Sequence, residues 1–114
     1  MCDSSISKLI DCQTPESAYT KVGLDGRDYK LVFSDEFNED GRTFEEGADS
    51  YWEAADMHYY ATQDLEYYDP SRITTKDGYL VIELIEAPDP EENHGHTYMS
   101  GMLSSWNKYV ATAV

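Results

Sequence analysis

Two adjacent carboxylates, Asp35 and Glu36, are the first side chains that could act as an acid and a base. Two carboxyl groups that act on one bond with retention of configuration stand about 5 Å apart. Neighbouring residues of a strand point to opposite faces of a sheet, so these side chains cannot reach the same bond. We therefore predict no catalytic residue here and expect both to hydrogen-bond at the end of a strand.

Two further patterns contain metal-ligand residue types. Glu36-x-Asn38-x-Asp40-Gly41 matches the first half of a calcium loop, but it starts with Glu and would close on Gly47 instead of Glu. His94 and His96 would project oppositely from a strand, and with His58 they lack the fixed further ligands that zinc requires. We predict an acidic turn and an exposed loop, with no metal site and no cofactor.

Four aromatic side chains could stack against the apolar faces of sugar rings. They are Trp52, Tyr67, Tyr68 and Trp106. In a domain with few aliphatic residues the same rings could fill the core, and the sequence leaves both alternatives open. We name Trp106, at the end of a predicted strand, and Tyr67 as candidate substrate-binding residues.

The composition limits the classes of partner. The 114 residues include 23 acidic and 8 basic side chains, which gives a formal net charge of −15. This balance argues against nucleic acid and against anionic membrane surfaces, because both require clustered Lys and Arg. The 10 tyrosines and 2 tryptophans do not fit a disordered acidic tail. The length suits one small domain.

The first residues, Met1–Ser7, lack the basic and apolar regions of a signal peptide. No run of the chain approaches the roughly 20 apolar residues of a membrane span. As written, the chain is expected to stay in the cytosol. We expect Cys2 and Cys12 to be free thiols there, with a bridge between them as the alternative.

The clearest local structure signal lies at Ile73–Glu86, which we predict to be a β-hairpin. Asp77-Gly78 suits its turn, because Gly takes a positive φ without penalty and Asp tolerates one. After the turn, Leu80, Ile82 and Leu84 alternate with the residues of the opposite face, as in a strand.

Other short strands complete an all-β prediction. Strands are expected at Tyr29–Phe37 and Thr97–Trp106, and in the second Gly101 marks a bulge or a close approach. Tyr51–Met57 could be a helix or an extended segment. Residues 1–28 form a lead-in. Four or five strands supply about one sheet, whereas an antiparallel sandwich buries the faces of two, so the sandwich is expected to be incomplete.

Several motifs resemble the fungal β-glucan synthesis-associated proteins of glycoside hydrolase family 16. The resemblance covers residues 29–109. The segments that carry it are Leu31–Asn38, Asp40–Phe44, Tyr51–Ala54, Leu65–Pro70, Ile73–Thr75, Asp77–Leu80 and Ser100–Tyr109. It implies a concanavalin-like β-jelly roll of two curved antiparallel sheets, with a sugar cleft on the concave face.

The resemblance also implies an activity and a location. Such proteins resemble retaining β-glucan hydrolases or transglycosylases and act in the assembly of cell-wall 1,6-β-glucan. β-Glucan is thus the expected partner. The parent would be a type II membrane protein of the secretory pathway or plasma membrane, held by an anchor that this chain lacks.

Two departures from the family pattern bear on activity. The family's nucleophile and acid/base lie on a Glu-x-Asp-x-x-Glu strand, and no glutamate here is followed two positions later by aspartate. After Trp106-Asn107-Lys108-Tyr109 the family continues with Cys and a Gly-Gly strand, whereas residues 110–114 diverge. The jelly roll is therefore expected to be incomplete at its C-terminus.

We expect a fragment of a β-glucan biosynthesis or remodelling protein, with a lead-in at 1–28, part of the family 16 domain at 29–109 and a divergent tail at 110–114. The chain itself is expected to catalyse nothing. One alternative is a non-catalytic carbohydrate-binding β-sandwich module. Another is an acidic scaffold that pairs through exposed sheet edges.

Overall fold

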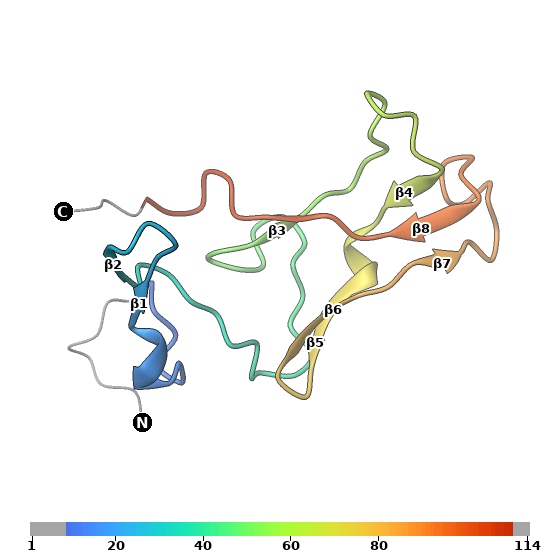
Figure 1. Ribbon diagram of the computed structural model, residues 1–114. Coiled ribbons are helices and arrows are strands. Elements are labelled where there is room, and N and C mark those ends of the chain that lie inside the picture. The colour runs from blue at the N-terminus through green and yellow to red at the C-terminus, as the bar shows by residue number, and fades with distance from the viewer. Residues whose placement is uncertain (1–8, 111–114) are drawn as a thin grey trace. The chain divides into compact units, whose positions relative to one another are not determined.

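The computed structural model describes residues 9–110, in which short strands pair in small sheets and are joined by turns and irregular segments (Figure 1). The chain divides into two compact units on either side of the Glu36–Phe37 bond, and each is described by itself. The first unit contains η1 (Glu16–Ala18), β1 (Thr20–Val22) and β2 (Asp28–Lys30). The second contains β3 (Glu53–Ala54), β4 (Glu66–Tyr68), η2 (Pro70–Arg72), β5 (Ile73–Lys76), β6 (Tyr79–Ile82), β7 (Ile85–Glu86), β8 (Tyr98–Ser100) and β9 (Leu103–Ser104).

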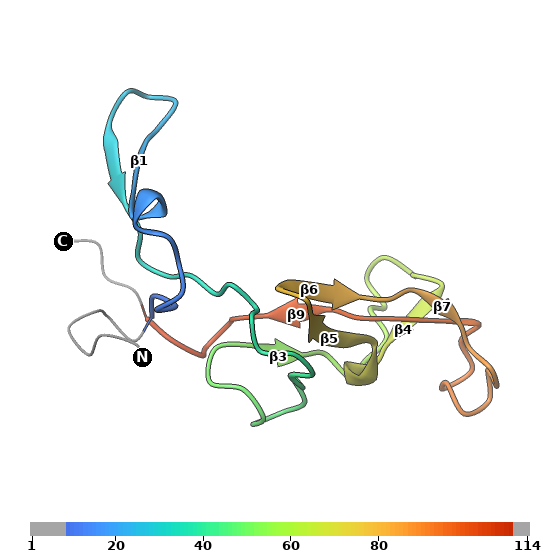
Figure 2. The same cartoon turned by 90° about the horizontal axis from the view of Figure 1, so that it is seen from below.

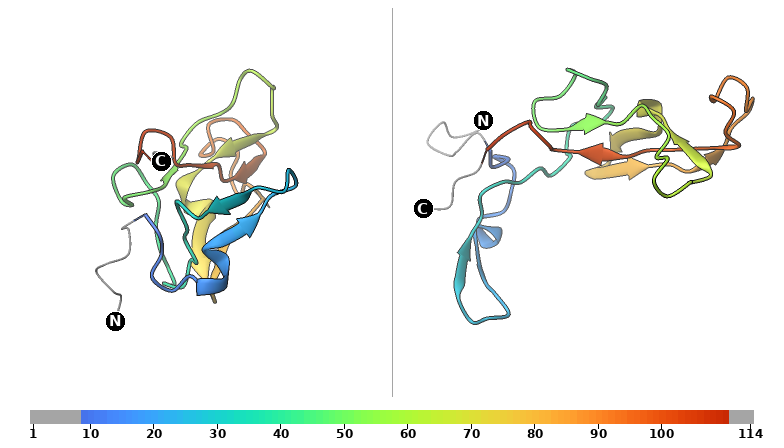
Figure 3. Two further views of the ribbon diagram at one scale, coloured as in Figure 1. Left: turned by 60° about the vertical axis from the view of Figure 1, so that its left-hand side comes forward. Right: turned by 90° about the horizontal axis from the view of Figure 1, so that it is seen from above.

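The first unit is built on an antiparallel hairpin of β1 and β2, drawn in blue and teal in Figure 3. Its turn contains Asp25-Gly26, with Gly26 at φ 78°, the same type of signal that marks the predicted hairpin further on. The hairpin lies mostly inside the predicted lead-in. The prediction of a strand over Tyr29–Phe37 is wrong beyond Lys30, because the backbone of Ser34 bonds to Leu9 and Asp11.

Cys12 in the first unit is disulfide-bonded, and Cys2, the other cysteine of the prediction, lies outside the described residues. The expectation of free thiols is therefore wrong for Cys12. That expectation rested on the compartment, which the sequence of this chain does not define.

The predicted hairpin in the second unit is confirmed. Strands β5 and β6 pair antiparallel from Ile73↔Ile82 to Lys76↔Tyr79. Asp77 and Gly78 take φ angles of 53° and 81°, which is the backbone of a type I′ turn. The pairing ends at Ile82, and β7 pairs with β8 instead, so the second predicted strand is divided in two.

Long-range pairs assemble the rest of the second unit. Strand β3 pairs antiparallel with β9, and Figure 2 shows these two strands alongside each other. Strand β8 lies between β7 and β4. The all-β class is confirmed, and the Tyr51–Met57 segment is extended. The β4–β8 pair is parallel, in contrast to the other pairs. A parallel pair needs a long crossover, and the chain supplies one between Tyr68 and Tyr98.

A small apolar core holds the second unit together. Phe44, Ala54 and Ile73 are buried, and Trp52, Leu80 and Leu103 pack against them. Trp52 thus belongs to the core, one of the two alternatives that the sequence left open. Gly101 interrupts the predicted Thr97–Trp106 strand between β8 and β9, where the backbone passes close to Ile73, as predicted. Across residues 9–110, no helix has both the length and the hydrophobicity needed to cross a bilayer.

Candidate functional site

Tyr67, one of the two candidate substrate-binding residues, lies on β4 with only 8% of its surface exposed. Its hydroxyl donates a hydrogen bond of 2.7 Å to Asp56 Oδ1. This bond to a carboxylate, together with burial of the ring, raises the pKa of Tyr67 to about 12. The phenol is therefore a fixed hydrogen-bond donor at neutral pH.

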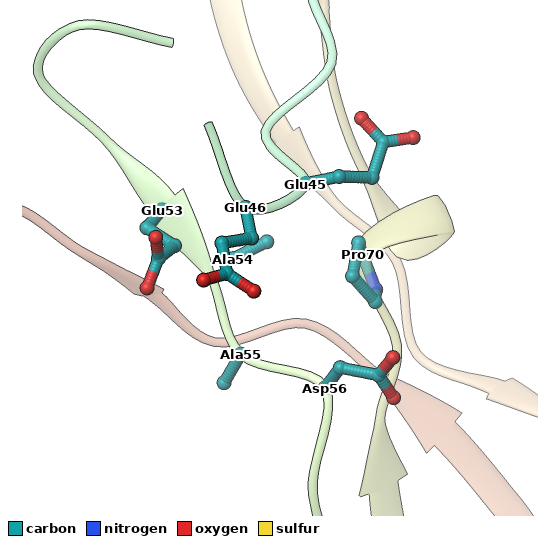
Figure 4. Close-up of a pocket in the computed structure, with 7 residues that line it drawn as sticks. All are labelled: Glu45, Glu46, Glu53, Ala54, Ala55, Asp56 and Pro70. Atoms are coloured by element: carbon teal, nitrogen blue, oxygen red, sulfur yellow. The ribbon is translucent and has the colours of Figure 1, made fainter. Parts of the chain in front are cut away.

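Asp56 connects Tyr67 to an acidic hollow of about 410 Å³ in the second unit. Figure 4 shows its lining: Glu45, Glu46, Glu53, Ala54, Ala55, Asp56 and Pro70. Lys108 Nζ lies 3.4 Å from Glu53 Oε1, which partly offsets the negative charge. Chemically, the hollow presents hydrogen-bond acceptors, and these suit a ligand with many hydroxyl donors.

Trp106, the other candidate, is 84% exposed and follows β9. Its backbone N–H donates to Ser104 Oγ at 3.0 Å, and Ser104 is paired with Glu53 of β3 at the edge of the hollow. Tyr67 belongs to the separate β4–β8–β7 sheet. Among the described residues no ring contact joins Trp106 to Tyr67. The structure therefore leaves the Trp106 ring in solvent, whereas the Tyr67 ring is buried beneath the loop between β7 and β8.

Tyr68, the neighbouring aromatic residue on β4, is held by polar contacts. Its hydroxyl donates to Asp64 Oδ2 at 2.9 Å and lies 3.1 Å from Glu66 Oε1. Burial and these hydrogen bonds raise the pKa of Tyr68. Its hydroxyl thus fastens β4 to the segment that precedes it.

Glu36 of the carboxylate pair bonds to an earlier segment of the first unit. Glu36 Oε1 accepts a hydrogen bond of 2.8 Å from Thr14 Oγ1, and the Glu36 N–H donates to Asp11 Oδ2 at 2.8 Å. The predicted hydrogen-bonding role is therefore confirmed for Glu36. The predicted setting is wrong, because Asp35 and Glu36 lie outside any strand.

The acidic turn contacts the β5–β6 hairpin. Asp40 Oδ1 accepts a hydrogen bond of 2.9 Å from the Asp77 N–H, and Arg42 N–H donates to Thr75 Oγ1 at 3.0 Å. Asp40 therefore stabilises the hairpin turn. Within residues 9–110 no group of three or more His, Cys, Asp or Glu side chains is arranged to hold a metal ion.

The three histidines form an arrangement that the sequence reading missed. The rings of His58 and His96 stack with centroids 4.1 Å apart, and His94 stacks on Tyr67 at the same separation. Tyr60 contacts His58 edge-on at 4.8 Å. His58 and His94 are 36 positions apart in the sequence, which hides this proximity, since only the pairing of β4 with β8 brings the two segments together. We call these five side chains the aromatic cluster.

Comparisons with known proteins agree with this architecture. The family described as "Beta-glucan synthesis-associated protein SKN1/KRE6/Sbg1" matches residues 2–114, a longer stretch than the motifs alone cover. The chain is 50% identical over 106 residues to Beta-glucan synthesis-associated protein KRE6 of Saccharomyces cerevisiae, which covers 93% of this chain and 14% of that protein. It is also 50% identical over 104 residues to the KRE6 protein of Candida albicans, covering 91% of this chain and 14% of that protein.

A solved structure shares the fold. The endo-beta-1,3-glucanase from Pyrococcus furiosus superposes with a TM-score of 0.55 and 26% sequence identity, over 80% of this chain and 35% of that enzyme. The chain thus corresponds to part of a glucanase-like β-sandwich and spans about a seventh of the length of its yeast relatives. Because the family match extends over residues 2–114, this chain belongs to the SKN1/KRE6/Sbg1 family of beta-glucan synthesis-associated proteins.

Proposed function

We propose that this region binds β-glucan within a cell-wall protein that builds or remodels the polymer. The observation that carries the proposal is Trp106, an indole left 84% exposed just after β9, the strand that pairs with β3 at the acidic hollow. An exposed indole is available to a ligand, and its flat apolar face with one polar N–H suits contact with a sugar ring. The relation to beta-glucan synthesis-associated proteins and to a glucanase supports a glucan chain as that ligand.

The proposed mode of binding has an apolar and a polar part. The Trp106 ring stacks on the apolar face of a glucose unit, and carboxylates of the neighbouring hollow accept hydrogen bonds from sugar hydroxyls. The negative charge of the hollow suits this neutral, hydroxyl-rich polymer better than a polyanion. No bond cleavage is assigned to these residues, because the Glu-x-Asp-x-x-Glu pattern of retaining family 16 enzymes does not occur in the 114 residues.

The whole protein, on this proposal, is a family 16-like hydrolase or transglycosylase that acts on 1,6-β-glucan in a fungal wall. Its expected location is the secretory pathway or the plasma membrane, with a membrane anchor contributed by another part of the protein. Fluorescence microscopy of the full-length parent tests this location. Uniform cytosolic signal would contradict it.

Binding is tested by co-sedimentation of the 114-residue chain with insoluble β-1,3-glucan and β-1,6-glucan, with chitin as the control polymer. We expect depletion of the chain from the supernatant by at least one glucan and none by chitin. Equal depletion by all three polymers would indicate nonspecific adsorption. No depletion by either glucan would overturn the proposal for this region.

A further inference from the structure

The chain has three histidines, and all three lie in the aromatic cluster. His94 and His96 belong to the loop between β7 and β8, whereas His58 precedes β4 and Tyr67 lies on β4. The two stacks therefore fasten that loop to β4 and to the segment before it. Asn93, at 3% exposure, secures the loop from within, since its side-chain amide donates to the carbonyl oxygens of His96 and Tyr98 at 2.8 Å.

The closed loop covers a candidate sugar-binding ring. His94 lies almost parallel to Tyr67, with an interplanar angle of 16° and a centroid distance of 4.1 Å. One face of Tyr67 is therefore occupied by an imidazole as long as the loop is closed. The loop must move before a sugar can stack on that face.

The stack of His58 on His96 responds to protons in a way that the other contacts do not. His58 Nδ1 lies 3.1 Å from the Glu66 carbonyl oxygen, which can only accept, so Nδ1 carries a hydrogen and a first proton enters at Nε2. If His96 is protonated as well, two positive charges stand about 4 Å apart. Their repulsion shifts the equilibrium between the stacked and the separated rings roughly fivefold towards separation, even in the dielectric of water. Protonated His94, in contrast, faces the π-system of Tyr67, which attracts a cation.

Other ionisable groups lie on the segments around the stack. They are Asp56, Tyr60, Asp64, Glu66, Tyr67 and His94. Hydrogen bonds from Thr62 and Tyr68 lower the pKa of Asp64, and the charge of His58 adds to this effect. The carboxylates therefore favour one imidazolium. In the described part of the chain none of these carboxylates forms a salt bridge with an imidazole, so no ion pair offsets the second charge on the stack.

We propose that the His58–His96 stack is an acid-sensitive latch, which holds the β7–β8 loop over Tyr67 when at most one ring is charged and releases it when both are. The open state binds one more proton than the closed state, so opening becomes more favourable as the pH falls. Histidine side chains are the usual pH-sensitive groups between about pH 5 and pH 8, and the latch is therefore tested across that range. Its link to glucan access through Tyr67 rests on the proposed function, but the opening itself does not.

Amide hydrogen exchange of the full 114-residue chain tests the latch. The reporters are the amides of His96 and Ala87, which donate within and at the base of the loop to Asn93 O and Thr97 O. We expect their protection factors to fall at least about fivefold between about pH 7.5 and pH 5, while the amides of the β5–β6 hairpin stay protected. A loss of protection that includes the amides of the β5–β6 hairpin would indicate global unfolding and would overturn the proposal.

Matched variants distinguish the effect of charge on the loop from the effect of ring stacking. His96→Phe keeps a flat ring on His58 but cannot be charged, so it should remove the pH response of the loop, and His58→Phe should do the same if the first variant fails to fold. His94→Phe is the control, because its ring faces Tyr67, and it should keep the response. Equal loss of protection in wild type and His96→Phe would overturn the latch, even if the chain binds glucan.

Discussion

Gly101 lies so close to Ile73 that a Cβ on residue 101 would stand 2.3 Å from Ile73 Cγ1. The contact joins the break between β8 and β9 to the first residue of β5, whose side chain is 2% exposed in the core. A methyl group at residue 101 has no room unless Ile73 or the backbone shifts. Gly101 therefore affects both the strand pairing and the core packing of the second unit.

Replacing Gly101 with Ala should destabilise the chain by about 1–3 kcal/mol, the usual cost of overpacking a filled core. Denaturant unfolding followed by circular dichroism measures the change in the free energy of unfolding. Thr97→Ala, at an exposed position, is the matched control and should stay within about 0.5 kcal/mol of wild type. An unchanged midpoint for Gly101→Ala would show that the approach to Ile73 is not tight.

The raised pKa of Tyr67 predicts that the folded chain loses stability in alkali. Its pKa is raised from 10.0 to about 12 in the folded chain, so its contribution is fully present below pH 10 and is lost as the pH rises towards 12. Thermal unfolding between about pH 9 and pH 12 should show a smaller loss for Tyr67→Phe than for wild type. Tyr79→Phe, at an exposed ring of the β5–β6 hairpin, should behave as wild type. The same loss in Tyr67→Phe and wild type would contradict the role of the bond to Asp56.

Asn93→Ala should cost about 1–3 kcal/mol, because it leaves the His96 and Tyr98 carbonyl oxygens without the donor that they share. Asn93→Asp should cost more near neutral pH, since a carboxylate would then face two carbonyl oxygens. Chemical denaturation of both variants, with the exposed Glu92→Ala as control, measures these differences. Greater stability of Asn93→Asp than of Asn93→Ala at neutral pH would contradict this account of the loop.

Local signals explain what the sequence could predict. The Asp77-Gly78 turn was predictable because it depends on the φ angles of two adjacent residues. A close approach at Gly101 was predictable from a glycine inside a strand pattern, but its partner Ile73, far away in the sequence, was not. The parallel pairing of β4 with β8 was not predictable, because no local pattern encodes a partner some thirty residues away. The histidine stacks depend on that pairing, so reading His94 and His96 as an isolated exposed loop missed them.

For the candidate site residues, the sequence showed which side chains have a chemistry that suits sugar binding, but not how exposed each side chain is. Trp106 and Tyr67 were named for their rings alone, and the structure leaves one ring in solvent while His94 covers the other. Trp52 packs in the core, although its residue type suits a sugar platform equally well. Burial is set by tertiary contacts, and a single sequence of aromatic-rich strands does not specify it.

The most direct test of glucan binding by this region compares two exposed aromatic residues. Trp106→Ala and Tyr79→Ala each remove an exposed ring, at 84% and 71% exposure, but only Trp106 follows the strand that pairs with β3 at the acidic hollow. Affinity electrophoresis in gels that contain soluble β-1,3-glucan or β-1,6-glucan measures the apparent dissociation constant of each variant. We predict at least a tenfold weakening for Trp106→Ala, about 1.4 kcal/mol, and less than a twofold change for Tyr79→Ala. Equal affinities for wild type and Trp106→Ala would contradict the central claim.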